Sequence, residues 1–321
     1  MAIELPFDPF PPFKGSHKQT IFGSVLHMQK NPASKTKHII LPDGDKLALE
    51  MSIPRKWKKT DLTVVMIHGL CGSHRSPYLI RMTKKLQKRG VRVFRFNLRG
   101  CGTGKGLAKH SYHGGQSEDI EEALRVLKKE TPNSPIILIG FSLGGGLALK
   151  LAGELKDKGK NFFKKVLAIN PPIDLYSSIT LFSKPENKIY ERYFSSLLRE
   201  DVYFRHNLFP DLPPVSLPQN MSLLEFDKLY TVPHYGFKDV MDYYQTCSAN
   251  KFIPFIEVPC NILLSKDDPI ISAESFEKIN FAEKTEVFVT QNGGHMGYLG
   301  TPGSNGGFHW MDNILLQWIF E

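Results

Sequence analysis

The stretch GFSLG (140–144) places a lone serine, Ser142, between an apolar run and a segment with helical spacing. A serine at a sharp strand-to-helix turn is held in a strained backbone conformation, and glycines two residues to either side remove the collisions that such a turn creates. The hydroxyl is then presented to a reactant instead of being buried. This placement predicts a nucleophile, and the alternative is a glycine-rich turn whose serine only caps the helix.

An acid and a base for this serine can be sought at the ends of later strands. A serine hydroxyl attacks a carbonyl group only when a base accepts its proton, and that base needs an acid to fix its tautomer. Asp267 and Asp268 follow the apolar run NILLS, and His295 follows TEVFVT in the loop QNGGHMGY. Parallel strands deliver such loops to one sheet edge. We favour Asp267 as the acid because it lies closer to the strand end, and Asp268, restricted by the following proline, is the alternative.

Two backbone N–H groups are predicted to stabilise the negative charge that develops on the carbonyl oxygen. One is the amide of Leu143, which follows the serine at a helix N-terminus, where the helix dipole also favours negative charge. The second is the amide of Leu70 in the loop HGLCG (68–72), which follows the apolar run LTVVMI. The alternative for that loop is a tight turn that needs two glycines.

Other candidate sites lack a comparable placement. His113 and His234 lie in polar or cap-like segments and His309 opens the last helix, so a structural role is expected for each. The glycine-rich run 100–106 looks like a phosphate cradle, but its spacing fails at Lys105. No carboxylate-histidine cluster has the spacing of metal ligands. We therefore expect chemistry that uses no cofactor and no metal.

The elements that must position these residues alternate along the chain. Apolar runs typical of buried strands alternate with amphipathic segments typical of helices, after a hairpin signal at Asp43-Gly44. This pattern predicts an α/β fold with a mainly parallel sheet covered on both faces. The predicted strands are 62–67, 91–96, 135–141, 165–170, 260–265 and 285–290, and the predicted helices are 78–89, 117–130, 143–156, 272–280 and 309–320.

The alternation is interrupted once. Residues 173–252 are rich in aromatic side chains, contain prolines and are mostly helical in pattern, and a segment of this length is more than a connecting loop. We expect this insertion to form a cap over the carboxyl ends of the strands and to contribute to an apolar pocket. The predicted organisation is a proline-rich arm (1–36), a core (37–172 and 253–321) and the cap (173–252).

Composition excludes several classes of protein. The 321 residues are 41% hydrophobic and 23% charged, as in an ordinary globular protein, and four scattered cysteines form no disulfide framework. The chain has no apolar run long enough to span a membrane and no secretory signal, so we expect a cytoplasmic protein. The net charge of +9 accompanies no nucleic-acid-binding motif, so no nucleic-acid partner is expected. Peripheral contact with an anionic membrane stays open, and no pattern specifies an oligomeric state.

Seven motifs in order carry a resemblance to a known family. From about residue 15 to the C-terminus, the chain resembles the YheT-like α/β-hydrolases, which are bacterial relatives of the eukaryotic abhydrolase-domain (ABHD) lipid esterases. The motifs are HGLCGSHRSPY (68–78), NLRGCG (97–102), YHGGQSED (112–119), GFSLGGG (140–146), HYGFKDVMDYY (234–244), LLSKDDP (263–269) and GGHMGYLG (293–300).

The resemblance implies an α/β-hydrolase fold with a helical cap and a serine carboxylesterase, with Ser142, Asp267 and His295 at the triad positions. We expect it to hydrolyse small-molecule acyl esters of short to medium chain length through an acyl-enzyme. Family relatives include phospholipases and alcohol acyltransferases. Acyl transfer to an alcohol, and lipase or phospholipase activity at a membrane surface, therefore remain alternatives.

Overall fold

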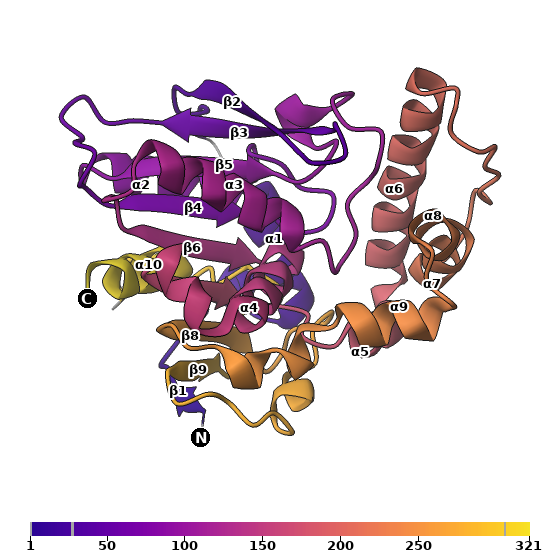
Figure 1. The fold of residues 1–321 in the computed structure, drawn as a ribbon. Helices are drawn as coiled ribbons and strands as arrows, with labels where there is room; N and C mark the ends of the chain where they lie inside the picture. The colour runs from indigo at the N-terminus through magenta and orange to yellow at the C-terminus, as the bar shows by residue number, and fades with distance from the viewer. Residues whose placement is uncertain (1, 27–28, 305) are drawn as a thin grey trace.

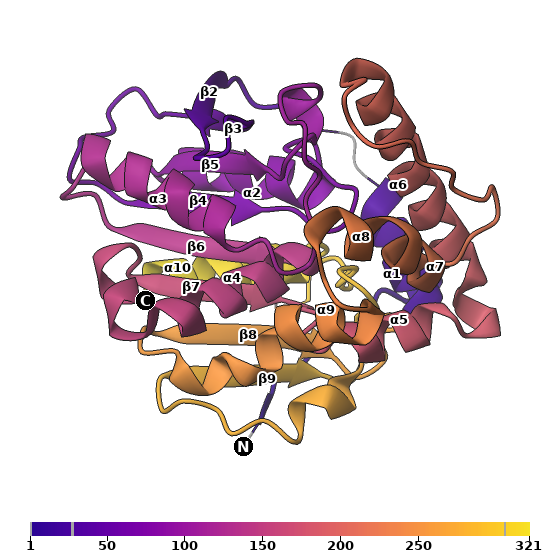
Figure 2. The same ribbon diagram turned by 45° about the vertical axis from the view of Figure 1, so that its right-hand side comes forward.

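The computed structural model describes residues 2–26, 29–304 and 306–321. Its central sheet has the strand order β1-β9-β8-β7-β6-β4-β5-β3-β2, and helices lie against both faces (Figures 1 and 2). Strand β3 is antiparallel to β2 and β5, and the remaining pairs are parallel. The strands are β1 (Ile3–Glu4), β2 (Lys35–Ile40), β3 (Lys46–Ser52), β4 (Thr63–Ile67), β5 (Arg92–Asn97), β6 (Ile136–Phe141), β7 (Lys165–Ile169), β8 (Cys260–Ser265) and β9 (Thr285–Thr290).

Two apolar cores, one on each face of the sheet, follow from the alternation of side chains along the strands. On one face Val65 and Leu138 pack with side chains of α3 and α4. On the other face Val64 and Ile139 pack with side chains of α2 and α10. The helices are α1 (Ser16–Val25), α2 (Pro77–Gln87), α3 (Glu118–Glu130), α4 (Leu143–Leu155), α5 (Leu175–Phe182), α6 (Lys188–Leu208), α7 (Leu223–Phe226), α8 (Val232–Tyr235), α9 (Val240–Cys247) and α10 (Trp310–Phe320).

The predicted α/β fold with a mainly parallel sheet is confirmed, and the six predicted core strands differ from the observed ones by at most one residue at either end. The helix predicted at 272–280 is wrong. Only a short 3-10 turn, Ala273–Phe276, forms there. The segment docks Phe276 into the core through separate i→i+3 bonds, including that from the Ile279 amide to the Phe276 carbonyl, so no continuous helix is needed.

The N-terminal segment, predicted as a separate arm, is built into the core. Strand β1 pairs in parallel with β9, with Ile3 opposite Phe288. Phe7 packs against Tyr298 and Trp310, at centroid separations of 5.8 and 5.2 Å. Helix α1 follows and lies beside the loop that contains His295, as described below.

The segment 173–252 connects β7 to β8 and carries α5, α6, α7, α8 and α9. In Figure 1 these five helices stand together at one side of the sheet, beyond the carboxyl ends of β4 and β6. Figure 2, turned by 45°, shows the same helices in front of that edge. The loops that follow the strands therefore open toward this helical insertion.

Candidate active site

Ser142 occupies a strained turn between β6 and α4. Its backbone has φ 51° and ψ −124°, which non-glycine residues rarely adopt, and its amide donates to the Ile169 carbonyl at 2.8 Å. A Cβ on Gly144 would stand 2.6 Å from the His68 carbonyl oxygen, and one on Gly140 would collide with the Gly144 backbone. Both glycines are therefore required by close backbone approach.

Three side chains from the ends of different strands form one hydrogen-bonded line. The Ser142 Oγ lies 2.9 Å from His295 Nε2, and His295 Nδ1 lies 2.8 Å from Asp268 Oδ2. The geometry allows Nδ1 to donate to the carboxylate while Nε2 accepts the serine proton, which is the arrangement that activates a serine nucleophile. The structure thus brings together Ser142 and His295, as predicted, with Asp268 as the third member.

The preference for Asp267 as the partner of His295 is wrong. Asp267 binds the backbone of the histidine loop instead of the imidazole ring, since its Oδ1 accepts the Gly294 amide at 2.8 Å. After β8 the chain turns tightly, so that the amides of Ile270 and Ile271 fold back onto Asp268 Oδ1 at 2.8 and 3.0 Å. This turn directs the Asp268 side chain toward His295. The distance of each aspartate from the strand end therefore does not decide which of the two contacts the histidine.

Asn170, at the end of β7, holds the same carboxylate from another side. Its Nδ2 donates to Asp268 Oδ2 at 2.7 Å, and its Oδ1 accepts the hydroxyl of Tyr298 at 2.9 Å. The sequence analysis missed Asn170, although its place as the last residue of the predicted core strand 165–170, at the carboxyl end, was a usable signal. The Asp268 side chain is 1% exposed, so this array of donors replaces the water that it lacks.

The loop after β4 lies directly against the nucleophile. A Cβ on Gly69 would stand 3.4 Å from Ser142 Oγ. The amides on either side of Leu70 are already used, since Gly69 N donates to Tyr78 Oη at 3.1 Å and Cys71 N donates to Tyr112 Oη at 2.8 Å. Among the described residues the Leu70 amide between them donates no hydrogen bond, so its role as an oxyanion donor stays a prediction.

His68 fixes the start of this loop. Its Nδ1 donates to the Gly69 carbonyl at 2.7 Å and its Nε2 accepts the Leu98 amide at 3.1 Å, which defines a neutral ring. Burial lowers the pKa of His68 to about 4, in agreement with that tautomer. His68 therefore supports the loop and takes no part in proton transfer at neutral pH.

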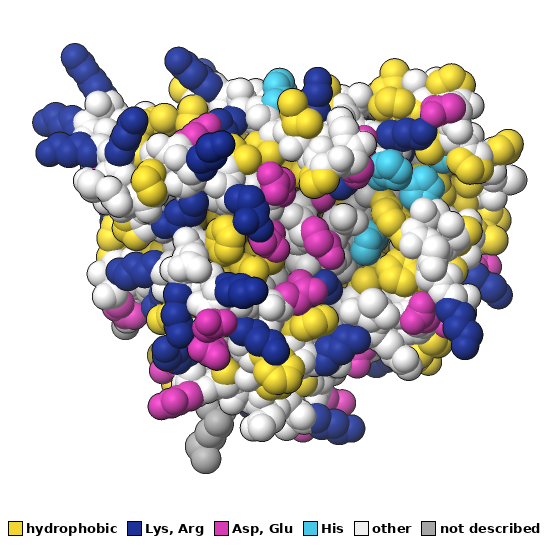
Figure 3. All heavy atoms as spheres, viewed as in Figure 1, with side chains coloured by type: hydrophobic (Ala, Val, Ile, Leu, Met, Phe, Trp, Pro, Cys, Tyr) yellow, Lys and Arg dark blue, Asp and Glu magenta, His cyan; other side chains and the backbone are white. Residues whose placement is uncertain are grey.

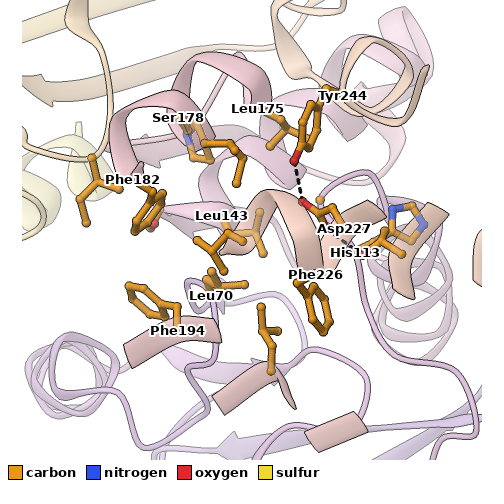
Figure 4. A pocket seen from close by; sticks show the side chains of 18 of the residues that line it. Leu70, His113, Leu143, Leu175, Ser178, Phe182, Phe194, Phe226, Asp227 and Tyr244 are labelled. Atoms are coloured by element: carbon orange, nitrogen blue, oxygen red, sulfur yellow. Dashed lines mark hydrogen bonds between the residues drawn. The ribbon is translucent and has the colours of Figure 1, made fainter. Parts of the chain in front are cut away.

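A pocket of about 820 Å³, including its open mouth, lies between the triad and the helical insertion. Ser142, His295, Leu70 and Leu143 line it together, so both predicted oxyanion donors belong to residues at the same cavity as the nucleophile. Figure 4 shows Leu70 and Leu143 near the middle of this pocket. Its apolar wall consists of Leu175, Ile179, Phe182, Phe194, Leu198, Leu223, Phe226, Ile270 and Ile271.

Comparison with known proteins decides the family. A family model described as the alpha/beta hydrolase fold matches residues 63–302. The chain belongs to the α/β-hydrolase family. It is 31% identical over 299 residues to the YheT protein of Escherichia coli (strain K12), itself named as an esterase, across 92% of this chain and 87% of that protein. The resemblance to YheT-like α/β-hydrolases is thereby confirmed.

More distant relatives of this α/β-hydrolase are also named as ester-processing enzymes. A monoacylglycerol lipase of Saccharomyces cerevisiae is 28% identical over 247 residues, which are 73% of this chain and 54% of that protein. Among solved structures, Est1E from Butyrivibrio proteoclasticus has a TM-score of 0.59 at 16% identity, and covers 88% of this chain and 98% of its own. The fold and the relatives identify a hydrolase of the carboxylesterase type.

Helix α1 of the α/β-hydrolase supports the histidine loop. The Thr20 hydroxyl accepts the His295 amide at 2.8 Å and donates to the Ser16 carbonyl at 2.7 Å. The Gln19 side chain, 0% exposed, donates to the Leu299 carbonyl at 3.1 Å and accepts the Leu299 amide at 2.7 Å. The sequence analysis missed these residues because they lie more than 270 positions before the loop that they hold.

We expect Thr20→Val to lower kcat by up to about tenfold with little change in KM, because the His295 amide loses its acceptor and an unpaired buried amide costs about 1–3 kcal/mol. Steady-state kinetics on one ester measures both parameters. Thr20→Ser should restore kcat. Ser24→Ala on the exposed side of the same helix is the control, and an equal loss there would contradict a positioning role for Thr20.

One cluster of carboxylate and imidazole groups outside the pocket has ligand atoms close enough to hold a metal ion. Asp43, Asp45 and His110 place ligand atoms within 4.8 Å of one another, but Arg99 Nη1 lies 2.5 Å from the Asp43 carboxylate and 2.7 Å from that of Asp45. The guanidinium supplies the positive charge that a cation would bring. This cluster lies on loops away from the pocket lining, so we assign it a structural role.

Three further histidines that the sequence analysis considered, His113, His234 and His309, divide between packing and the pocket. His234 stacks on Tyr230 at a centroid separation of 4.9 Å, and burial lowers its pKa to about 4. His309 directly precedes α10, and burial lowers its pKa to about 4 as well. His113, for which a structural role was expected, lines the pocket instead.

In the described part of the chain no helix is both long and apolar enough to cross a membrane.

Proposed function

We propose that the protein is a serine carboxylic ester hydrolase that acts on short- to medium-chain acyl esters through an acyl-enzyme. The observation that carries the proposal is the hydrogen-bonded line from Asp268 through His295 to Ser142, with distances of 2.8 and 2.9 Å, at an apolar pocket. Fluorophosphonate labelling of the purified protein, followed by turnover of p-nitrophenyl octanoate, tests it. Absence of both would refute it.

In the proposed mechanism, Ser142 Oγ attacks the ester carbonyl while His295 Nε2 takes the hydroxyl proton. The amides of Leu143 and Leu70 hold the oxyanion, and the imidazolium is stabilised by Asp268. The protonated histidine then gives its proton to the leaving alcohol, and an acyl-Ser142 ester remains. Water attacks this ester with His295 as base and releases the acid.

The acyl chain is assigned to the apolar end of the pocket. Phe182, Leu223 and Ile270 belong to one buried cluster, against which Phe194 and Leu198 pack, and all five line the cavity. Figure 4 shows Phe182 and Phe194 at one side of the pocket, with Leu70 and Leu143 toward its middle. A chain that leaves the carbonyl toward this end is surrounded by hydrocarbon.

We therefore expect kcat/KM to rise with acyl length, by up to about fourfold per methylene, and then to fall once the pocket is full, because each buried methylene contributes about 0.8 kcal/mol. A series of p-nitrophenyl esters from acetate to decanoate measures the profile. Leu198→Trp should move the maximum to a shorter chain. Ile189→Ala, at a 65% exposed position on the same helix, should leave it unchanged, and a flat wild-type profile would contradict the assignment.

Acyl transfer to an alcohol is the second candidate function. A relative in Saccharomyces cerevisiae, 28% identical over 264 residues covering 74% of this chain and 58% of its own, is named a medium-chain fatty acid ethyl ester synthase/esterase. The same acyl-enzyme serves both reactions, and only the second nucleophile differs. Product analysis at rising ethanol concentration distinguishes them, since transfer yields the ethyl ester and hydrolysis yields the acid.

A cytoplasmic location and peripheral contact with an anionic membrane complete the proposal, and both rest on the sequence. On the face in Figure 3, Lys and Arg side chains lie among Asp and Glu side chains and form no continuous stripe. Electrostatic attraction of this face to lipid is then modest and salt-sensitive. Co-sedimentation with phosphatidylserine vesicles at low and high salt measures it.

A further inference from the structure

A carboxylate lines the pocket at the side opposite the apolar end. Asp227 belongs to the turn Asp227–Thr231, which has π-helical hydrogen bonding and joins α7 to α8. Such turns are rare and occur often at functional sites. In Figure 4, Asp227, His113 and Tyr244 lie together on one side, Phe182 and Phe194 lie on the other, and Leu70 and Leu143 lie between them.

The hydrogen bonds of Asp227 leave part of its acceptor capacity free. Oδ1 accepts the Thr231 hydroxyl at 2.7 Å and Oδ2 accepts the Tyr244 hydroxyl at 2.9 Å. Each carboxylate oxygen can accept two bonds, so one position on each remains. Among the described residues no Lys or Arg forms an ion pair with Asp227, and its burial raises its pKa to about 6. An unpaired carboxylate in an apolar pocket is costly unless a ligand uses it.

The position of the ester decides which part of the substrate reaches Asp227. The carbonyl carbon must lie at Ser142, and the acyl chain is assigned to the side of Phe182 and Phe194, so the alcohol portion extends toward Asp227. We propose that Asp227 accepts hydrogen bonds from free hydroxyl groups of this alcohol portion, which makes the preferred substrate a partial ester of a polyol. This inference rests on the proposed ester hydrolysis.

The surroundings of Asp227 favour a neutral hydroxyl ligand over a cationic head group. Thr231, Tyr243, Tyr244 and His113 line the same end of the pocket and are neutral donors and acceptors. Burial and the charges of Lys150 and Arg99 lower the pKa of His113 to about 3. Both bonds that Asp227 already accepts come from neutral hydroxyl groups, those of Thr231 and Tyr244, and a further hydroxyl group of a ligand fits the same pattern.

The experiment compares esters that share the octanoyl group. 1-Octanoylglycerol and propyl octanoate differ by two hydroxyls, and octanoylcholine adds a cationic arm. We expect wild type to favour the glyceryl over the propyl ester by about 10- to 100-fold in kcat/KM, as a hydrogen bond to a charged group provides. Asp227→Asn should reduce this preference to a few-fold while propyl octanoate turnover stays within about threefold. No preference in wild type, or a preference for the choline ester lost in Asp227→Asn, would overturn the proposal.

Tyr244→Phe is the matched control for a purely structural role. It removes the bond to Oδ2 but keeps the carboxylate, so the preference for the glyceryl ester should persist. If Tyr244→Phe loses the preference as fully as Asp227→Asn, the carboxylate serves only to hold Tyr244 and the inference is wrong. Turnover of p-nitrophenyl octanoate by wild type reports separately on ester hydrolysis, so failure of the proposed function is distinguishable from failure of this one.

Discussion

Replacement of Ser142 by alanine is expected to lower ester hydrolysis by at least about a thousandfold, because the oxyanion donors and the pocket alone supply only residual catalysis. The substitution removes one oxygen from a residue at a strained φ of 51° and leaves its backbone hydrogen bond to Ile169 in place. The free energy of unfolding should therefore change little. Initial rates on p-nitrophenyl octanoate and a thermal melt measure both quantities.

The control for this substitution is Ser178→Ala, a serine that lines the same pocket but lies on α5. It should retain turnover within a few-fold and should still react with a fluorophosphonate, whereas Ser142→Ala should not be labelled. Undiminished hydrolysis by Ser142→Ala, or labelling of that variant, would mean that another residue is the nucleophile.

Asp268→Asn is expected to reduce kcat by about 10⁴-fold, which is the scale found when the acid of such a triad becomes an amide. The amide nitrogen cannot accept the His295 Nδ1 proton, and an amide does not stabilise the imidazolium by charge. The side-chain carbonyl oxygen of the asparagine can still accept hydrogen bonds from the amides of Ile270 and Ile271, so the turn after β8 should persist. A kcat measurement at saturating ester, with a melting curve, checks the prediction.

Asp267→Asn is its neighbour control. Asp267 contacts the histidine loop through one backbone hydrogen bond, in which its Oδ1 accepts the Gly294 amide. The side-chain oxygen of an asparagine can keep that bond. We expect kcat within about tenfold of wild type, since a neutral hydrogen bond contributes about 1 kcal/mol. A larger loss in Asp267→Asn than in Asp268→Asn would contradict the geometry of the imidazole contact.

The sequence could predict those residues of the site that directly follow a strand. Ser142 and His295 each follow an apolar run of strand length, and parallel strands bring such positions to one edge whatever their separation in the chain. The choice between Asp267 and Asp268 depends on the direction of a turn. That direction follows from amides folding back onto Asp268, which no periodicity encodes.

Helix α1 illustrates why other parts of the site were not predictable. Its buried residues are Gln19, Thr20 and Gly23, which are polar or small, so an apolar stripe is absent. The polar side chains are satisfied by the backbone of the histidine loop, and a Cβ on Gly23 would stand 2.6 Å from the Gly297 Cα. A helix without an apolar stripe is predicted to be exposed to solvent on all sides, because the sequence does not show which backbone groups its polar side chains will bind.

The pairing of the first residues with the last strand bears on the order in which the molecule becomes active. Ile3 lies opposite Phe288, and the Gln19 side chain binds Leu299, 280 positions later. A ribosome releases residues 3–20 long before residues 288–299 have been made, so α1 cannot dock against the histidine loop until then. The turn that carries Ser142 is made earlier, but the loop that carries its base is held only after residues 293–299 have been added. On the proposed mechanism, nascent chains that stop before this loop therefore do not hydrolyse esters.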